Sequence, residues 1–372
     1  MKRLHIILFS ALAFTTAQAQ SKFNLLVGTY TNTCASNGIY VYEFNASSGA
    51  FSLKNSTENA NVLSPSYLSV SSNNKFIYAV NENGTQSTVS AFNYNAPTGK
   101  LTLINKNASL GADPCHIIND DKNVIVANYS GGSIAVFKKN ADGSITEAQQ
   151  LIQHEGKGPN AARQEKAHVH MVVFSPDKKF ILSNDLGQDK VFIYKYNAGA
   201  AHEMLTLKNT VDVKKGSGPR HLTFSKDGKF VYLVQELDGT LTTFSYDKNG
   251  SLKLLKETNI IPKDFKGANS SAAIKISPDG KFLYVSDRGD VNMLSVYKIA
   301  KTGGIELVEQ VSTLGKGPRD FAIDPTGNYL LVGHQYTNDI IIFKRDKLTG
   351  KLKNTGKKIE LCSPVGLLFT KS

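Results

Sequence analysis

One sequence unit recurs along most of this chain, and it restricts the possible folds more than any other feature. The clearest copies read GPRHLTFSKDGKFVYLVQE from Gly218, SSAAIKISPDGKFLYVSDR from Ser270 and GPRDFAIDPTGNYLLVGHQ from Gly317. The first strand residue after the turn marks six copies, at intervals of 47 to 56 residues: Phe76, Val124, Phe180, Phe230, Phe282 and Tyr329. A regular period of about fifty residues predicts an array of similar structural units.

Each unit contains four stretches in which apolar and polar residues alternate, as in residues 230–235, 240–246 and 252–258. This two-residue periodicity, bounded by Gly, Asn and Asp, predicts β-strands, and no helical stripe accompanies it. Four antiparallel strands without a covering helix must stack against neighbouring units, as the blades of a propeller do.

The seventh unit is divided between the two ends of the chain. Residues 363–369 resemble a first strand, and residues 24–30, 39–44 and 51–57 supply the other three. Pairing these segments removes the two edges that an open array would expose. We therefore predict an all-β fold, a seven-bladed β-propeller of four-stranded antiparallel blades, with the ring closed by pairing the C-terminal strand with the N-terminal strands.

In such a propeller, the residues just before each first strand and just after each second strand meet on one rim of the central channel. The opposite turns carry the Lys, Asp, Gly and Asn of ordinary solvated hairpins. The rim positions instead carry His116, Asn128, Tyr129, His168, His170, Asp185, Arg220, His221, Glu236, Ser271, Asp287, Arg288, Arg319, Asp320, His334 and Gln335. We expect the functional site at this rim.

The first 19 residues have the features of a secretory signal. Lys2 and Arg3 precede an apolar run from Leu4 to Phe14, and residues 17–19 form a small-x-small cleavage pattern. We expect a cleavable signal peptide over residues 1–19, a periplasmic location and a single propeller domain over residues 20–372. No later segment approaches the ~20 apolar residues that a membrane span needs.

The formal net charge of +12 raises the question of nucleic acid. The Lys residues are scattered over turns and outer strands and form no stripe with aromatic residues, so we interpret them as a solvated basic surface without a nucleic-acid partner. The positive balance favours a small anionic molecule as the partner. A closed ring has no edge that requires a second chain, so we expect a monomer.

The three cysteines leave at least one thiol unpaired in an oxidising compartment. Cys34 and Cys362 both lie on the functional rim of the composite blade, so a disulfide between them and three free thiols are both open, and the Cα separation decides. Cys115 is expected to be a buried first-strand residue and not a nucleophile. The sequence has no Cys-x-x-Cys and no zinc-finger His pair, so no metal and no cofactor are expected.

The motifs of this chain resemble those of the seven-bladed-propeller lactonase family, which includes propeller-type 6-phosphogluconolactonases and carboxymuconate-lactonizing enzymes. The resemblance covers nearly all of the mature chain. Its carriers are VGTYT at Val27, RQEKAHVH at Arg163, SNDLGQDKVFIY at Ser183, GPRH at Gly218, QEL at Gln235, SDRG at Ser286 and the long copy at Gly317. It implies a lactone hydrolase of 6-phosphogluconolactonase type that acts on a sugar lactone at the channel mouth.

The resemblance implies that the catalytic and ligand-binding groups are a His, two Arg and a Glu around the channel mouth. By motif they correspond to His168 or His170, Arg220, Glu236 and Arg288. The family usually has Pro before the first of the paired histidines, whereas this chain has Ala167, which leaves the choice between the two open. In a regular strand both histidines would point the same way, toward the channel.

Further rim and loop residues are expected to bind the substrate, because binding groups collect on long loops held by a rigid scaffold. They are Arg163, Gln164, His116, Asp185, His221, Arg319, His334 and Gln335. Several of these residues also have a structural interpretation. A lone channel histidine is often a hydrogen-bonded structural group, and an Asp in a turn commonly binds backbone amides.

Opening a lactone requires a base for the attacking water and positive charge for the carbonyl oxygen. Glu236, or a histidine at 168 or 170, can act as the base, and the arginines can stabilise the oxyanion or grip a carboxylate or phosphate. Two other functions stay open: a non-catalytic secreted propeller that binds a sugar acid or a protein, and ring closure of the muconate type. Because phosphorylated gluconolactone is a cytoplasmic metabolite, an exported enzyme is expected to meet other lactones or an unphosphorylated one.

Overall fold

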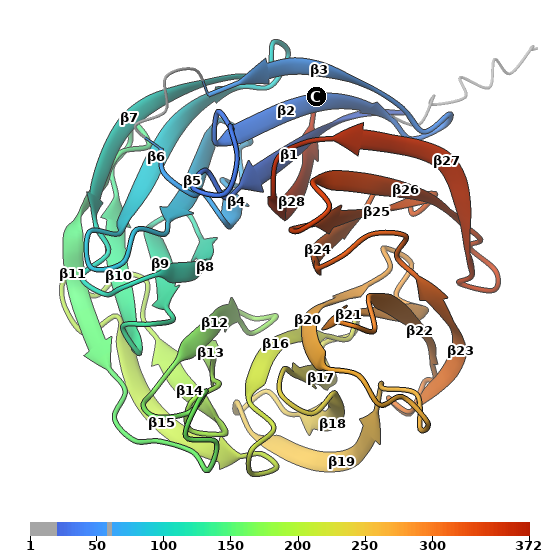
Figure 1. Cartoon of the computed structure of the whole chain (residues 1–372). Coiled ribbons are helices and arrows are strands. Elements are labelled where there is room, and N and C mark those ends of the chain that lie inside the picture. The colour runs from blue at the N-terminus through green and yellow to red at the C-terminus, as the bar shows by residue number, and fades with distance from the viewer. Residues whose placement is uncertain (1–20, 58–61) are drawn as a thin grey trace, which may run out of the picture.

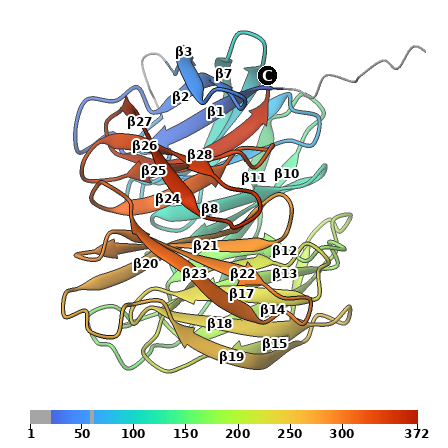
Figure 2. The ribbon, with the colours of Figure 1, turned by 90° about the vertical axis from the view of Figure 1, so that its right-hand side faces the viewer.

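The repeat folds into seven four-stranded antiparallel sheets arranged around a central channel (Figure 1). The computed structural model describes residues 21–57 and 62–372, and those residues contain no helix. Seen from the side, with the channel axis horizontal, inner strands such as β8 and β21 run roughly along that axis (Figure 2). The predicted seven-bladed propeller is confirmed. The expected signal peptide, residues 1–19, lies outside the described residues.

Six blades are each built from four consecutive strands, ordered from the channel outward. Their strands are β4 (Leu68–Val70), β5 (Phe76–Asn81), β6 (Thr88–Asn95) and β7 (Lys100–Ala108); β8 (Pro114–Asn119), β9 (Asn123–Asn128), β10 (Ser133–Lys139) and β11 (Ile145–Gln153); β12 (Val169–Phe174), β13 (Phe180–Asp185), β14 (Lys190–Tyr196) and β15 (Leu205–Asp212); β16 (Pro219–Phe224), β17 (Phe230–Gln235), β18 (Thr240–Tyr246) and β19 (Leu252–Asn259); β20 (Asn269–Ile276), β21 (Phe282–Gly289), β22 (Met293–Ile299) and β23 (Ile305–Ser312); β24 (Pro318–Ile323), β25 (Tyr329–His334), β26 (Asp339–Arg345) and β27 (Leu352–Glu360).

The seventh blade joins the two ends of the chain. The C-terminal strand β28 (Pro364–Lys371) pairs antiparallel with β1 (Lys22–Thr29), which continues to β2 (Ile39–Asn45) and β3 (Ala50–Ser56). Figure 1 shows this closure where the blue and red ends of the ribbon meet. A disulfide between Cys34 and Cys362, whose Cα atoms are 5.9 Å apart, links the same two ends on the functional rim.

The Ser-x-Asp sequence of the repeat explains its first hairpin. Ser225 Oγ donates to Asp227 Oδ1 (2.6 Å) and accepts a bond from the backbone N–H of Phe230 (3.0 Å). Ser277 makes the same two bonds with Asp279 and Phe282. These side chains replace backbone partners in the turn, as short polar residues commonly do.

A glycine in the outer hairpin of one blade packs on the marker aromatic residue of the blade before it. An added Cβ at Gly143 would lie 2.2 Å from the ring of Phe76, and one at Gly303 would lie 2.2 Å from the ring of Phe230. Both glycines also have a positive φ, which other residues rarely adopt. The marker aromatic residue therefore selects glycine in the next blade.

Apolar residues from neighbouring blades form seven separate hydrophobic clusters, one at each blade interface among the described residues. The interface between the β4 and β8 blades buries Tyr78, Val80, Val124 and Phe137 completely. Full burial of one such side chain is worth about 1.5–3 kcal/mol. The core therefore forms a ring around the channel, and the channel lining is left free for polar groups.

Candidate functional site

A β-bulge in several first strands turns one additional side chain toward the channel mouth. In β8, Pro114 pairs with Asn128 and His116 with Ala127, so Cys115 has no partner across the strand. The same irregularity isolates His170, Arg220 and Arg319 in β12, β16 and β24. Bulges are common beside active sites because they redirect side chains.

The residues at the ends of the second strands supply the other wall of the site. Tyr30, Glu82, Tyr129 and Glu236 each follow directly after the second strand of their blade, and Arg288 lies near the end of β21. All five line one cavity at the channel mouth, together with three of the four bulge residues. The repeat thus brings residues from far-apart blades to one place.

We name this cavity the mouth pocket. Its volume is about 360 Å³, within the size range of small-ligand sites. Its lining residues are Tyr30, Glu82, Asp113, Cys115, Tyr129, Ser130, Arg163, His170, Glu236, Ser270, Arg288, Arg319 and Tyr336.

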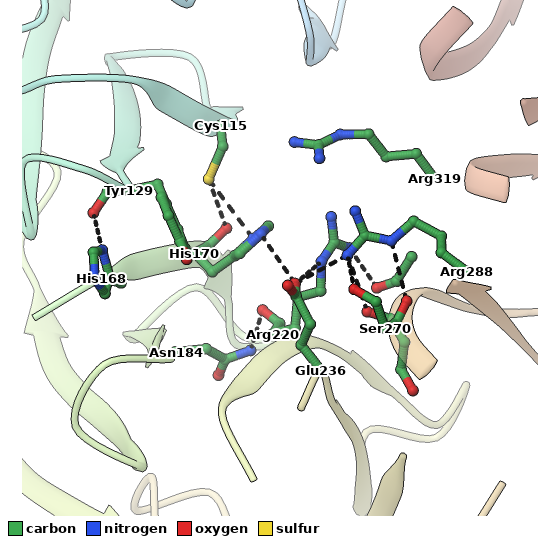
Figure 3. A network of polar contacts seen from close by, with 12 residues as sticks. Cys115, Tyr129, His168, His170, Asn184, Arg220, Glu236, Ser270, Arg288 and Arg319 are labelled. Atoms are coloured by element: carbon green, nitrogen blue, oxygen red, sulfur yellow. Dashed lines mark hydrogen bonds and ion pairs between the residues drawn. The ribbon is translucent and has the colours of Figure 1, made fainter. Parts of the chain in front are cut away.

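Glu236 is the centre of an ion network in the mouth pocket (Figure 3). Its carboxylate accepts from Arg163 Nη2 at 2.6 Å and Arg220 Nε at 2.9 Å, and Arg288 Nη2 lies at 3.1 Å. His170 Nε2 lies 3.9 Å away. Burial favours the neutral acid, but the charges of Arg288 and Arg220 outweigh it and hold the pKa of Glu236 well below its usual range.

Arg220 lies beneath the mouth pocket, where its side chain is 2% exposed. Besides Glu236, its guanidinium donates to the backbone carbonyl of Ala272. Burial and the nearby charge of Arg288 lower the pKa of Arg220 to about 9, so the side chain stays cationic at neutral pH. This predicted catalytic residue therefore anchors Glu236 from below and does not line the cavity.

His170 faces the mouth pocket and is almost completely buried. Cys115 Sγ lies 3.6 Å from its Nδ1. Burial, together with the charge of Arg220, lowers the pKa of His170 well below 6.5. The imidazole is therefore neutral at neutral pH. Burial also raises the pKa of the Cys115 thiol, which makes it a poor nucleophile.

Arg319 extends into the mouth pocket from the same side as Arg288 and lies above it in the view of Figure 3. Its side chain is 16% exposed, and its Nη2 lies 3.9 Å from Glu82 Oε1. The guanidinium lies over the ring of Tyr30, 5.4 Å from the centroid. Within residues 21–57 and 62–372, it has no hydrogen-bond acceptor in range. A largely buried guanidinium with free donors is suited to binding an anionic oxygen.

The two candidate histidines of the HVH motif do not share one environment. The bulge at His170 breaks the two-residue alternation, so the expectation that both would face the channel is wrong. His168 lies beyond Tyr129 (Figure 3), where Nδ1 is 3.2 Å from Tyr129 O and Nε2 is 3.1 Å from Glu165.

Other predicted substrate-binding residues lie outside the mouth pocket, although Arg163 and Arg319 line it. Gln164 donates to Leu186 O and Asp189 Oδ1, and Asp185 accepts from the backbone N–H of His168 and from Gln188. His334 is fully buried with Nδ1 2.7 Å from Asp339, and its neighbour Gln335 does not line the cavity. Gln164, Asp185 and His334 thus bind loop and strand-end groups around the pocket.

His116 and His221 lie deeper in the channel. The ring centroids of His170 and His221 are 5.2 Å apart, and those of His221 and His116 are 5.3 Å apart. Tyr67 lies against His116 with its ring tilted by 33° and the centroids 4.2 Å apart. We call Tyr67, His116 and His221 the aromatic plug. A second cavity of about 380 Å³ lies beyond it, beside Lys275 and Asp320. Burial and the charge of Arg220 lower the pKa of His116 to about 3. The plug closes the floor of the mouth pocket.

Sequence reasoning missed several residues that line the pocket, among them Tyr30, Glu82, Ser270 and Tyr336. A signal for Glu82 was present, because it follows Phe76 by the same six positions that separate Glu236 from Phe230. Nothing comparable marks Tyr336, which lies in a loop and is 63% exposed. In the described part of the chain, no group of three or more His, Cys, Asp or Glu side chains is placed to hold a metal ion.

Residues 24–369 match the protein family described as Lactonase, 7-bladed beta-propeller. The chain therefore belongs to this family, and it is a lactonase, as the resemblance predicted. No helix with the length and apolar character to cross a bilayer occurs in residues 21–57 or 62–372.

Two named relatives and one solved structure are similar to this chain over most of its length. The chain is 33% identical over 353 residues to a 6-phosphogluconolactonase of Bacillus subtilis, covering 94% of this chain and 99% of that protein. It is 36% identical over 342 residues to a 6-phosphogluconolactonase of Formosa agariphila, covering 90% and 96%. The solved structure of the periplasmic gluconolactonase of Pseudomonas aeruginosa has a TM-score of 0.89 and 35% identity, covering 94% and 99%.

Proposed function

We propose that this lactonase hydrolyses a sugar lactone in the mouth pocket. Relatives named 6-phosphogluconolactonase and gluconolactonase support the substrate class. The observation that carries the location is the grouping of His170, Glu236, Arg288 and Arg319 around one cavity of about 360 Å³. Its polar lining offers hydrogen bonds to the hydroxyl groups of a small sugar ring.

His170 is the general base in this proposal. Its neutral imidazole can take a proton from water as the oxygen attacks the lactone carbonyl, a contribution of typically 10²- to 10⁴-fold. Glu236 is unsuited to this role, because the arginines hold its pKa well below its usual range, which makes the carboxylate a weak base, and because they occupy its oxygen atoms. Its part is to hold Arg163 and Arg288 at the pocket wall.

Arg319 and Arg288 supply positive charge for the carbonyl oxygen, which becomes an oxyanion in the tetrahedral intermediate. Among residues 21–57 and 62–372 the donors of Arg319 have no acceptor within hydrogen-bond distance, and Arg288 uses Nε and Nη2 for Ser270. Donors of this kind stabilise an oxyanion by about 3–4 kcal/mol. The same charges favour substrates and products that carry an anionic group.

We also propose that the enzyme is exported to the periplasm, because residues 1–19 have the pattern of a cleavable signal peptide. Export would place the enzyme in an oxidising compartment, which suits the disulfide between Cys34 and Cys362. An exported lactonase is expected to act on unphosphorylated aldonolactones. Mass spectrometry of the protein purified from its native host should give a mature chain that begins at Gln20.

The test compares two histidines that are two residues apart. We expect His170→Gln to lower the rate of gluconolactone hydrolysis by about 10²- to 10⁴-fold. The rate is measured as acid release, after the spontaneous hydrolysis of the lactone is subtracted. The matched variant His168→Gln should keep the rate within a few-fold, because His168 does not line the pocket. Equal losses in both variants would contradict the assignment. Thermal stabilisation by the lactone without turnover by the wild type would favour a binding protein.

A further inference from the structure

Glu82 is a second carboxyl group in the mouth pocket, and the mechanism above does not use it. It follows β5 just as Glu236 follows β17, so the two glutamates occupy equivalent positions in their blades. Two blades, those of β8 and β12, separate their blades on one side of the ring. Both side chains line the same cavity.

The surroundings of Glu82 come from four neighbouring elements. Tyr30 Oη donates to the carboxyl group, at 3.1 Å and 3.2 Å from its two oxygens, and Ser66 Oγ also donates to it. Arg319 Nη2 lies 3.9 Å away. Asp113, in the loop before β8, adds negative charge nearby.

This environment differs from that of Glu236 in one decisive way. Three guanidinium groups lie within 3.1 Å of Glu236, whereas Arg319 lies 3.9 Å from Glu82, outside hydrogen-bond distance. Burial, with a smaller contribution from Asp113, raises the pKa of Glu82 above 4.5 even though Arg319, Ser66 and Tyr30 oppose the rise. Two carboxyl groups whose pKa values are shifted in opposite directions are typical of a site in which one acts as an acid and the other stays an anion.

We propose that Glu82 is the proton donor to the ring oxygen of the lactone, the leaving group of the hydrolysis. This inference rests on the proposed function. A ring-opened alkoxide is a poor leaving group unless it is protonated as the carbon–oxygen bond breaks. Glu82 is placed for this role because it lines the cavity beside Arg319, the arginine with free donors.

The proton balance is closed. His170 takes one proton from water, and the resulting hydroxide oxygen bonds to the carbonyl carbon. When the tetrahedral intermediate collapses, the electron pair of the breaking carbon–oxygen bond stays on the ring oxygen, which takes the proton of Glu82. The products are a carboxylic acid and an alcohol, and the proton on His170 returns to Glu82 through solvent in the open pocket.

The leaving group gives a sharp test. Dihydrocoumarin releases a phenol, with a pKa of about 10, whereas δ-valerolactone releases an aliphatic alcohol close to water in acidity, at about 16. We expect Glu82→Gln to slow δ-valerolactone hydrolysis by about 10²- to 10⁴-fold but to slow dihydrocoumarin hydrolysis by less than about tenfold. A merely structural role would reduce both rates by the same factor.

A second variant tests the acid without touching the lining of the pocket. Ser66→Ala removes a hydrogen bond that lowers the pKa of Glu82. A proton donor works in its protonated form, so the alkaline limb of the rate profile for δ-valerolactone should move to higher pH in this variant. An unchanged limb, or equal losses on both lactones in Glu82→Gln, would overturn the inference. A wild type without activity on any lactone would instead refute the proposed function.

Discussion

Replacing Glu236 with Gln tests the ion network on which the mouth pocket depends. The substitution keeps the shape of the side chain and removes its charge. Arg220, 2% exposed, then loses its only anionic partner among the described residues, and Arg288 and Arg163 lose theirs. We expect a clear loss of stability, because buried guanidinium groups without an anion are costly.

The magnitude follows from the burial of both partners. Removing one partner of a buried ion pair costs about 3–5 kcal/mol. At about 2 °C per kcal/mol for a chain of this size, the melting temperature should fall by about 6–10 °C. Calorimetry or circular dichroism would measure this difference.

Glu360→Gln is the matched control, since Glu360 pairs with Lys358 at a position 77% exposed. An ion pair so open to solvent contributes little to the free energy of unfolding, so this variant should have the melting temperature of the wild type. If Glu236→Gln also melted at the wild-type temperature, the conclusion that Glu236 stabilises the fold by pairing with the buried arginines would be wrong.

The difference in melting temperature between the wild type and Glu236→Gln should depend on pH in one direction only. The folded-state pKa of Glu236 is depressed, so its contribution to stability is complete above its ordinary pKa of 4.5 and is lost as pH falls through the lower folded value. The gap in melting temperature between wild type and Glu236→Gln should therefore be constant from neutral pH to pH 4.5 and should narrow in more acidic solution.

Three further predictions concern the disulfide between the two chain ends, the general base His170 and a close backbone contact at Gly28. Replacing Cys34 and Cys362 with Ser should lower the stability by about 2–4 kcal/mol, and a reductant should destabilise the wild type but not the double variant in thermal unfolding. Because the pKa of His170 lies well below 6.5, kcat/KM for dihydrocoumarin, whose phenol depends little on the proton of Glu82, should stay level as pH falls to 6.5 and decline only in more acidic solution; an acid limb above that value would exclude His170 as the base. Gly28→Ala should reduce soluble yield and melting temperature, because the added Cβ would lie 2.0 Å from the carbonyl oxygen of Pro65, whereas Gly304→Ala, whose nearest atom is 3.7 Å away, should behave as the wild type.

Most of the fold could be predicted from the sequence, because each repeat contains its own local instructions. The alternation of apolar and polar residues set the strands, and the Ser-x-Asp turns set the hairpins. The split seventh unit predicted the pairing of β28 with β1. The rim position of Arg288 and Glu236 followed from the same reading, since both lie near the ends of second strands.

The tertiary structure alone decided which rim residues meet. Sequence alternation assumes a regular strand, but bulges break that alternation at His170 and Arg319 and turn those side chains into the pocket. His168 is thereby excluded from it, although it shares a motif with His170. Glu82 belongs to the site because the ring brings its blade within reach of Arg319, more than two hundred residues away. Such contacts depend on how the blades close around the axis, and no local pattern in the chain encodes that distance.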